Sequence, residues 1–546
     1  MYRQVSDPLG HPALAALLAS TPLLVLLALL GVLRLKSHWA ALAGLATAFL
    51  IATAGYGMPL GQAADGALEG AAFGLFPIVW IILGAVWINR LQRTSGHFDL
   101  IGQTFSSLSD DVRVQAVLIA FCFGAMIESL SGFGTPIAVT SLILLGLGLE
   151  PLKAAAVAAF ANTAPAAFGS VGNPIQTLAK VTSLPGADLG AMVGRQSAVI
   201  AALVPFVLLL LLDGRRGLRE AWPVALVAGL GFAVGQFLCS NYLTYQLTDL
   251  AASLTSLAAV VLLLRVRGRG TAGRGVGGSG VGSSGAGASG AGGSGGERAP
   301  RREVLLAFLP YALITALFAL VSYGGPIARF VKDQDVSFPW PGLHVVTATG
   351  RPVAVTTFDF GWLGAAGTLL LVTGVLTALA LRVPARRALR CYLDALHQIR
   401  WAAVTIGCVL ALSYLMNLSG MAFSIGTWLA GLGGAFALLS GFTGWFGVAL
   451  TGSDTSSNAL FGAMQVSAAQ HIGLSPLLAA ATTSTGGVQG KAVAMQNLVI
   501  AASAVGRYGR EGEVLRRIIG WSLAVLAVLC LLAWLQSTPV LGWMVP

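Results

Sequence analysis

Residues 148–156 read GLEPLKAAA, and residues 473–481 read GLSPLLAAA. The two segments lie far apart in a chain of 546 residues, and the stretches around them are rich in Gly, Ser and Thr. In each half, one polar stretch precedes the Gly-Leu-x-Pro turn, and a second follows it after a short apolar segment. The two halves therefore look like repeats of one another, each with two polar interruptions.

Composition indicates the environment of these repeats. Apolar residues make up 56% of the chain and charged residues only 10%, whereas a soluble globular domain carries about 25% charged residues. Continuous apolar runs of about 20 residues, enough to cross ~30 Å of hydrocarbon, recur along the chain, starting at 14–33. Alternating β-barrel strands would be shorter, and no cleavage site follows the first run. We expect an all-α polytopic membrane protein with about 12–14 transmembrane helices.

Basic and acidic residues are distributed unevenly among the predicted loops. The net charge is +11, and the basic residues cluster in short loops between apolar runs, which is the positive-inside pattern of a membrane protein rather than evidence for nucleic-acid binding. The intervening loops, one with Asp65 and Glu69 and one around Asp249, are acidic or nearly uncharged. This alternation puts the two Gly-Leu-x-Pro turns on opposite sides of the membrane, as in inverted repeats.

A Gly/Ser-rich segment divides the chain. Residues 268–296 are almost entirely Gly, Ser, Ala and Val with a few Arg, a composition that cannot bury enough apolar surface to offset chain entropy. We expect an N-terminal transmembrane half at 1–265, a flexible cytoplasmic linker at 266–303 and a C-terminal transmembrane half at 304–546. The loop at 329–360 is long enough to form an ordered cap.

The polar interruptions of the first half are costly in a membrane. Residues 126–136 read MIESLSGFGTP within otherwise apolar sequence, and residues 161–174 read ANTAPAAFGSVGNP. A carboxylate such as Glu128 costs ~3 kcal/mol or more at the bilayer centre, and Gly-x-Gly followed by Thr-Pro breaks a helix. Such segments must line a polar cavity enclosed by protein, because lipid cannot satisfy their backbone groups.

The second half has matching interruptions. Residues 451–458 read TGSDTSSN, and residues 482–491 read TTSTGGVQGK, which ends with the one strong cation of that stretch, Lys491. Helix N-termini that meet at midplane attract anions, so a carboxylate substrate suits this site. Lys491 would add a full positive charge, hydroxyls and amides would bind a 2-hydroxyl group, and Glu128 or Asp454 could carry a coupled proton. Substrate-binding candidates are Ser131, Gly132, Gly134, Thr135, Asn162, Thr163, Ser453, Thr455, Ser456, Asn458, Gly487 and Lys491.

Each candidate also has a structural alternative. Glu128 could simply pair with Lys491, Asp454 could be an N-cap, and Lys491 could snorkel to an interface. Asn162 and Asn173 could satisfy broken backbone. The six histidines and five cysteines show no metal-ligand or disulfide spacing, so we expect no metal site.

These segments resemble the bacterial lactate permease family, whose members carry Glu-x-x-x-Gly-Phe-Gly-Thr-Pro, Asn-Thr-Ala-Pro-x-Ala-Phe-Gly, Gly-Ser-Asp-Thr-Ser-Ser-Asn and Gly-Gly-Val-x-Gly-Lys elements. The matching positions here are 128–136, 162–169, 452–458 and 486–491. The resemblance implies uptake of L-lactate, with D-lactate or glycolate as further substrates, by proton symport across the bacterial inner (cytoplasmic) membrane. It also implies an ion-transporter-superfamily-like fold, no cofactor, and compatibility with a homodimer.

Other function classes fit less well. An enzyme would need a nucleophile with its base at one depth, and Ser453 and Asp454 have no His or second Lys nearby in the sequence. The duplicated halves favour alternating access over a channel. Sodium coupling stays open, because Asp454 with hydroxyls and carbonyls could coordinate Na⁺.

Overall fold

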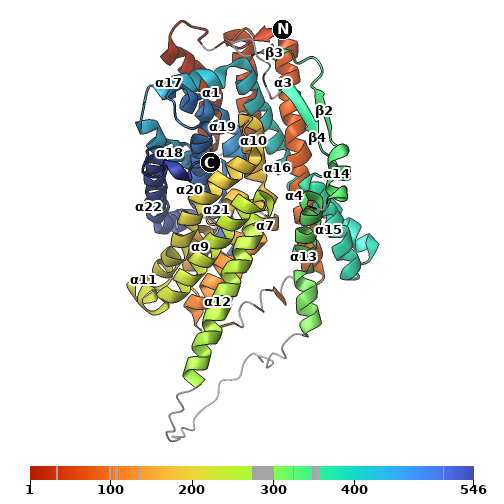
Figure 1. Ribbon diagram of the computed structural model, residues 1–546, viewed down its shortest axis with the longest axis vertical. Coiled ribbons are helices and arrows are strands. Elements are labelled where there is room, and N and C mark those ends of the chain that lie inside the picture. The colour runs from red at the N-terminus through yellow and green to blue at the C-terminus, as the bar shows by residue number, and fades with distance from the viewer. Residues whose placement is uncertain are drawn as a thin grey trace, which may run out of the picture.

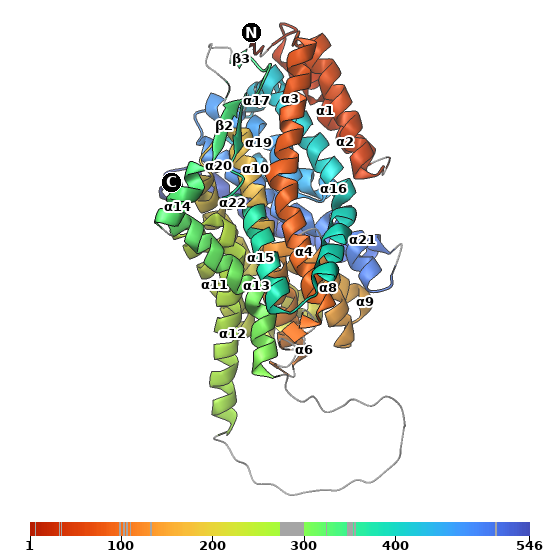
Figure 2. The same ribbon diagram turned by 90° about the vertical axis from the view of Figure 1, so that its right-hand side faces the viewer.

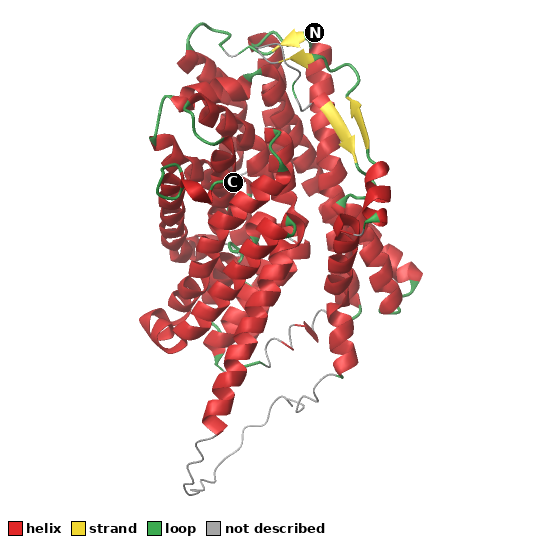
Figure 3. Ribbon diagram, in the orientation of Figure 1, coloured by secondary structure: helices red, strands yellow, loops and turns green. Residues whose placement is uncertain are grey.

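The computed structural model covers the chain and describes residues 1–546 except 6, 32, 34, 98–99, 102–103, 105–107, 110, 132–133, 273–299, 324, 347–352, 354–355 and 508–509. Helices dominate the part of the chain that is described (Figure 3). The all-α membrane architecture expected from the sequence is therefore confirmed. Most of the predicted linker at 266–303 lies outside the described residues; α12 reaches Ala272 before it and α13 starts at Arg301 after it.

The elements of the N-terminal part follow one another as short and long helices with several π-helical segments (η). They are β1 (Tyr2–Arg3), α1 (Pro12–Gly31), α2 (Ser37–Leu50), η1 (Ile51–Gly55), α3 (Leu60–Phe73), η2 (Gly74–Val79), α4 (Trp80–Thr94), α6 (Val112–Ala116), η3 (Val117–Phe123), α7 (Gly124–Ser131), α8 (Thr135–Gly146), α9 (Pro151–Ala161), η4 (Ala166–Phe168, 3₁₀), α10 (Gly169–Thr182), α11 (Gly186–Tyr242), η5 (Tyr245–Leu247, 3₁₀) and α12 (Thr248–Ala272).

The C-terminal part begins with a long helix and a small β cap. Its elements are α13 (Arg301–Tyr323), α14 (Pro326–Asp333), β2 (Val336–Pro339), β3 (Val345–Val346), β4 (Thr357–Phe360), α15 (Ala366–Ala380), α16 (Ala385–Ser419), α17 (Met421–Ala430), α18 (Ala435–Thr451), α19 (Asp454–His471), α20 (Pro476–Val493), α21 (Met495–Ala504), α22 (Glu511–Gln536) and η7 (Gly542–Met544, 3₁₀).

Both halves of the sequence contribute to each of two helix groups. In the first group, α2, α3 and α4 pack against α16, and α4 also packs against α15. In the second group, α18, α19 and α20 pack together, α20 contacts α11 and α22, and α10 contacts α19 (Figures 1 and 2). We call the first group the scaffold and the second, together with α7 to α9, α12 and α21, the core.

The core holds the repeats predicted from the sequence. Each repeat reads helix, break, helix, Gly turn, Pro-initiated helix, break, helix: η3–α7 to α10 in the first half and α18 to α21 in the second. The last helix of each repeat packs on the hairpin of the other, since α10 lies against α19 and α21 lies against α8 and α9. The two repeats therefore pack on each other reciprocally.

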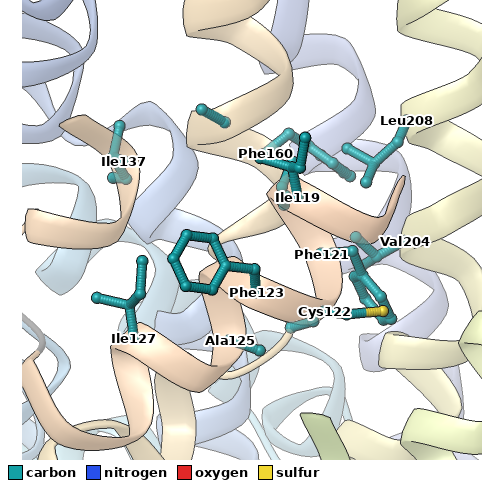
Figure 4. Packing of buried hydrophobic residues seen from close by; sticks show 14 of the residues in the cluster. Ile119, Phe121, Cys122, Phe123, Ala125, Ile127, Ile137, Phe160, Val204 and Leu208 are labelled. Carbon is teal, nitrogen blue, oxygen red and sulfur yellow. The ribbon is translucent and has the colours of Figure 1, made fainter. Parts of the chain in front are cut away.

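Glycines permit the closest helix contact of the core. A Cβ at Gly490 or Gly486 of α20 would collide with the backbone of Trp445 or Gly441 of α18, and a Cβ at Gly444 would collide with Thr483 of α20. These two helices thus approach backbone to backbone. An apolar cluster around η3 supports the other repeat; Figure 4 shows Phe121, Phe123 and Phe160 among its members, together with Val204 and Leu208 of α11.

Among the described residues, eight helices are long and apolar enough to cross a membrane, or nine if the bent pair α9 and α10 counts as one span. This count is lower than the expected number of spans for two reasons. Shorter apolar helices such as α8, α17 and α18 are not included in it, and α11 counts once although its backbone is broken at Asp213 and Gly214.

Two acidic segments that the charge pattern assigned to external loops are helical and buried. Glu69 is 0% exposed within α3, against α16, and Asp249 is 1% exposed in the first turn of α12. The loop assignment was wrong for both, because net loop charge does not register which side chains face a neighbouring helix. The predicted cap is structured in its described part, where β2 pairs with β4 and β1 pairs with β3.

Candidate functional site

The breaks of the two repeats converge on a cavity of about 490 Å³. Its inner wall comes from α7, the start of α8, the bend before α10, the α18–α19 break and the α20–α21 break, and its outer rim comes from α2 and α16 of the scaffold. The residues that line it are Lys36, Ser37, His38, Glu128, Gly134, Ala166, Gly169, Ser170, Asn173, Pro174, Trp401, Ala402, Thr405, Ile406, Thr451, Gly452, Ser453, Asp454, Thr455, Ser456, Lys491, Gln496 and Asn497.

A buried ion pair joins the two repeats on the cavity wall. Lys491 Nζ donates to Glu128 Oε1 at 2.5 Å, although the two residues are 363 positions apart in the sequence. Asn162 Nδ2 donates to the second carboxylate oxygen, Oε2, at 3.1 Å, and Asn497 Nδ2 donates to the Lys491 carbonyl at 2.9 Å. Glu128 is 2% exposed and Lys491 7% exposed, so the pair is largely shielded from solvent where charges interact strongly.

Backbone breaks shape the wall on the first-half side. Gly134, the N-cap of α8, has φ 75°, a left-handed conformation that costs little for glycine. Ser170 and Val171 also adopt left-handed φ values of 48° and 60°, which are strained for side chains of these types. Gly172 completes the turn at 71°. The segment Ala166–Thr182, which contains this turn, is bent by 59° from α9, and Ser170 and Asn173 line the cavity.

The start of α19 faces the cavity from the second half. Gly452 has φ 76° and ends α18, and the Ser453 side chain accepts a bond from the Ser456 N–H at 3.3 Å as the N-cap of α19. Asp454, Thr455 and Ser456 all lie in the first turn and line the cavity. An 18-residue helix therefore directs its N-terminus, with its partial positive charge, toward the space beside Lys491.

Asp454 belongs to a buried polar network behind this N-terminus. Its Oδ2 accepts from Ser484 Oγ at 3.0 Å and from Asn458 Nδ2 at 3.5 Å. Asn458 Nδ2 also donates to the Pro174 carbonyl and to Ser484 Oγ, so the network ties α19 to α10 and α20. Within the described part of the chain, Asp454 Oδ1 and Asn458 Oδ1 are buried without a hydrogen-bond partner.

Seven of the residues predicted from the sequence line the cavity. They are Glu128, Gly134, Ser453, Asp454, Thr455, Ser456 and Lys491.

The other predicted residues lie elsewhere. Asn162 and Asn458 lie one hydrogen bond behind the wall, whereas Thr163 donates to the Phe160 carbonyl inside the core. Gly487 leaves room for the Asp454 carboxylate. Thr135, the first residue of α8, is half-buried and is not among the lining residues. Gly132 and the side chain of Ser131 lie outside the described residues.

Sequence reasoning missed the scaffold side of the cavity. Lys36 and Trp401 form its exposed rim, and the His38 ring stacks on Trp401 with a centroid distance of 4.4 Å. These residues lie near the start of α2 and in the middle of α16, and no sequence signal pairs them with the repeats. Gln496 and Asn497, which follow Lys491 beyond the α20–α21 break, were noted in the sequence as polar but were not selected.

The arrangement is suited to binding a small anion. An ammonium group and a helix N-terminus converge where hydroxyls and amides supply further hydrogen bonds. The Glu128 carboxylate already forms an ion pair with the Lys491 ammonium, so an anion that binds Lys491 must compete with this carboxylate.

The sequence matches the family model described as L-lactate permease over residues 15–540. The chain is 37% identical to the glycolate permease GlcA of Escherichia coli K12, with 100% of this chain and 99% of that protein aligned. It is 36% identical to the L-lactate permease of the same strain and 34% identical to that of Bacillus subtilis 168, each alignment covering 100% of both proteins.

Two solved structures show a more distant similarity. MtrF of Neisseria gonorrhoeae, described as one of a class of antimetabolite efflux pumps, aligns with 86% of this chain and 82% of its own at 13% identity and a TM-score of 0.45. The YdaH transporter of Alcanivorax borkumensis aligns with 98% of this chain and 99% of its own at 16% identity and a TM-score of 0.44.

Proposed function

Because this chain belongs to the L-lactate permease family, we propose that it takes up L-lactate, with D-lactate and glycolate as further substrates, by proton symport across the bacterial cytoplasmic membrane. The relatives, an L-lactate permease and a glycolate permease, support a small 2-hydroxycarboxylate as the substrate. The family is one of permeases, which supports transport rather than catalysis as the role of the cavity.

One observation carries the coupling proposal: the cation of the cavity is already paired with a carboxylate from the other repeat. A buried charge that loses its partner costs several kcal/mol. When the substrate carboxylate binds Lys491, the buried Glu128 side chain is left without its cation. Glu128 then binds a proton, and the loaded site holds one substrate anion, one ammonium and one neutral carboxyl group.

The return step follows from the same charges. Once the substrate leaves, Lys491 is again unpaired, so Glu128 releases its proton and re-forms the ion pair. Each cycle thereby moves one proton with one substrate anion. Hydroxyls of the α19 first turn, from Ser453, Thr455 and Ser456, are placed to bind the substrate 2-hydroxyl group, since they line the same cavity.

Uptake into proteoliposomes tests this function. Labelled L-lactate is presented with an inward proton gradient, with an inward sodium gradient, or with neither. We expect accumulation with the proton gradient only, and we expect Glu128→Gln to abolish accumulation while lactate exchange across the membrane persists. Failure of the proton gradient to drive accumulation by the wild-type protein would contradict proton symport.

Sodium coupling is the second candidate, and a specific observation favours it. Asp454 Oδ1 and Asn458 Oδ1 are buried acceptor oxygens without partners in the described structure, and such oxygens are the ligand type that hard cations prefer. If Na⁺ binds there, the sodium gradient alone drives lactate accumulation, and Asp454→Asn removes the sodium dependence. The same gradient experiment therefore separates the two couplings.

We also propose that the chain consists of two transmembrane halves, 1–265 and 304–546, joined by a spacer at 266–303. The described helices α12 and α13 end and begin near these limits, which supports the division. Deleting residues 276–292 should leave lactate uptake within twofold of the wild-type rate; a loss of uptake in a normally inserted protein would contradict the spacer role.

A further inference from the structure

Asp249 is a third acid near the ion pair, and neither the family motifs nor the cavity lining include it. It lies in the first turn of α12, and its side chain is among the most buried acids of the chain, at 1% exposure. Both carboxylate oxygens lack a hydrogen-bond partner in the described structure. An ionised carboxylate in this state costs several kcal/mol, so the group needs a proton or a cation to be stable.

The charged groups that act on Asp249 are those of the transport site. Helix α12 packs against α7, which carries Glu128 (Figure 1), and Asp249 interacts electrostatically with both Glu128 and Lys491. The elements packed around α12 also carry other charged side chains, among them Lys180 on α10, which pairs with Asp359, and Arg195 on α11, which bonds Asn241, but the charged groups that act on Asp249 are Glu128 and Lys491. Lys491 is therefore the one cation that Glu128 and Asp249 share among the described residues.

The turn before Asp249 is fixed to the cavity wall. The Tyr245 side chain leaves no room for a Cβ at Gly172 or Gly190, because its ring atom Cδ2 lies 2.7 Å from the ideal Cβ position of Gly172 and its Cβ lies 2.6 Å from that of Gly190. Gly172 belongs to the same left-handed turn as Ser170, which lines the cavity. Rearrangement of this turn upon substrate binding would thus reach Asp249 through one aromatic ring.

We propose that Asp249 is a proton-binding residue of the transport site and exchanges its proton with Glu128. The inference rests on the proposed function and deepens it, because it names a second proton carrier. Two carboxyl groups that share one ammonium cannot both be ionised at low cost. With Glu128 paired to Lys491, Asp249 holds the proton; with lactate on Lys491, Glu128 needs one.

The transfer balances in charge and atoms. As the substrate carboxylate displaces Glu128 from Lys491, the O–H bond of Asp249 breaks and an O–H bond forms on Glu128, directly or through water. Asp249 is then ionised at the N-terminus of a 25-residue helix, where the helix dipole stabilises the anion until water supplies a new proton. The net change is one proton taken up for each lactate bound.

Asp249→Asn tests the proposal, because asparagine mimics the protonated acid but can neither give nor accept the proton. In proteoliposomes with labelled L-lactate, we expect proton-driven accumulation to slow at least tenfold, while lactate exchange, which needs no net proton transfer, stays within twofold of wild type. The matched control is Asp188→Asn, which changes an exposed aspartate in the first turn of α11 and should alter neither readout.

The outcomes separate this proposal from the proposed function. If wild-type protein accumulates lactate on a proton gradient and Asp249→Asn does so equally well, the role of Asp249 is refuted while symport stands. If wild type itself fails, the proposed function is refuted first. Should Asp249→Asn not insert, Asp249→Glu decides: a shifted pH dependence of uptake supports a titrating residue, and an unchanged profile at normal rate refutes it.

Discussion

Removing the cation of the cavity should weaken substrate binding strongly, while the protein still folds and inserts. In Lys491→Met the apolar stem remains but the ammonium that bonds Glu128 is lost. Truncating one partner of a buried, hydrogen-bonded charge pair costs about 2–5 kcal/mol. At about 1.4 kcal/mol per factor of ten, lactate affinity should fall by about 30-fold to about 4,000-fold.

The assay is equilibrium binding of labelled L-lactate to purified protein. The matched control is Lys153→Met, because Lys153 donates to the Leu212 carbonyl away from the cavity. The lactate affinity of this variant should equal that of wild type. Lys491→Met should also lower the thermal unfolding midpoint, and the double variant with Glu128→Gln should recover the midpoint but not the affinity, since removing both buried charges is nearly neutral. Affinity within threefold of wild type in Lys491→Met would refute the reasoning.

Two further predictions concern the wall and the exterior of the core. Gly169→Ala places a Cβ 2.7 Å from Glu128 Oε1, so the ion pair must shift and lactate uptake should fall at least tenfold, whereas Gly146→Ala, with open space around it, should transport normally. A hydrogen bond from Arg517 lowers the pKa of Glu150, so this pair stabilises the protein above the ordinary carboxyl pKa and loses its effect as the pH falls through the lowered pKa. The thermal unfolding midpoints of wild type and Glu150→Gln should therefore differ at pH 7 and converge in acid. A constant difference between the two midpoints across this pH range would contradict the pairing.

Sequence reasoning found the inner wall of the cavity for an energetic reason. A carboxylate, a lysine and helix-breaking glycines inside apolar sequence are too costly to be incidental, and this argument selected Glu128, Asp454 and Lys491, all of which line the cavity. Helical architecture followed from hydropathy in the same way. Both inferences depend on the free-energy cost of placing particular residues in a membrane, which can be judged from the local sequence alone.

The remaining features depend on tertiary packing between helices, which cannot be read from the local sequence. The sequence assigned Asp249 and Glu69 to loops from the alternation of loop charge, yet helix contacts bury both side chains. Lys36 and Trp401 reach the rim only because α2 and α16 pack together. The separation of the scaffold helices α2–α4, α15 and α16 from the repeats likewise follows from tertiary contacts.

The ion pair between the repeats also has a consequence during synthesis. Glu128 enters the membrane while Lys491 is still 363 residues from being translated, which at about 5–20 residues per second is a delay of roughly 20–70 s. Throughout that interval the nascent first repeat lacks the cation that pairs with Glu128, so it must hold this acid as a neutral group or keep it near water. Completion of the second repeat supplies the counter-charge, so helices made late in synthesis stabilise the first repeat through the Glu128–Lys491 ion pair.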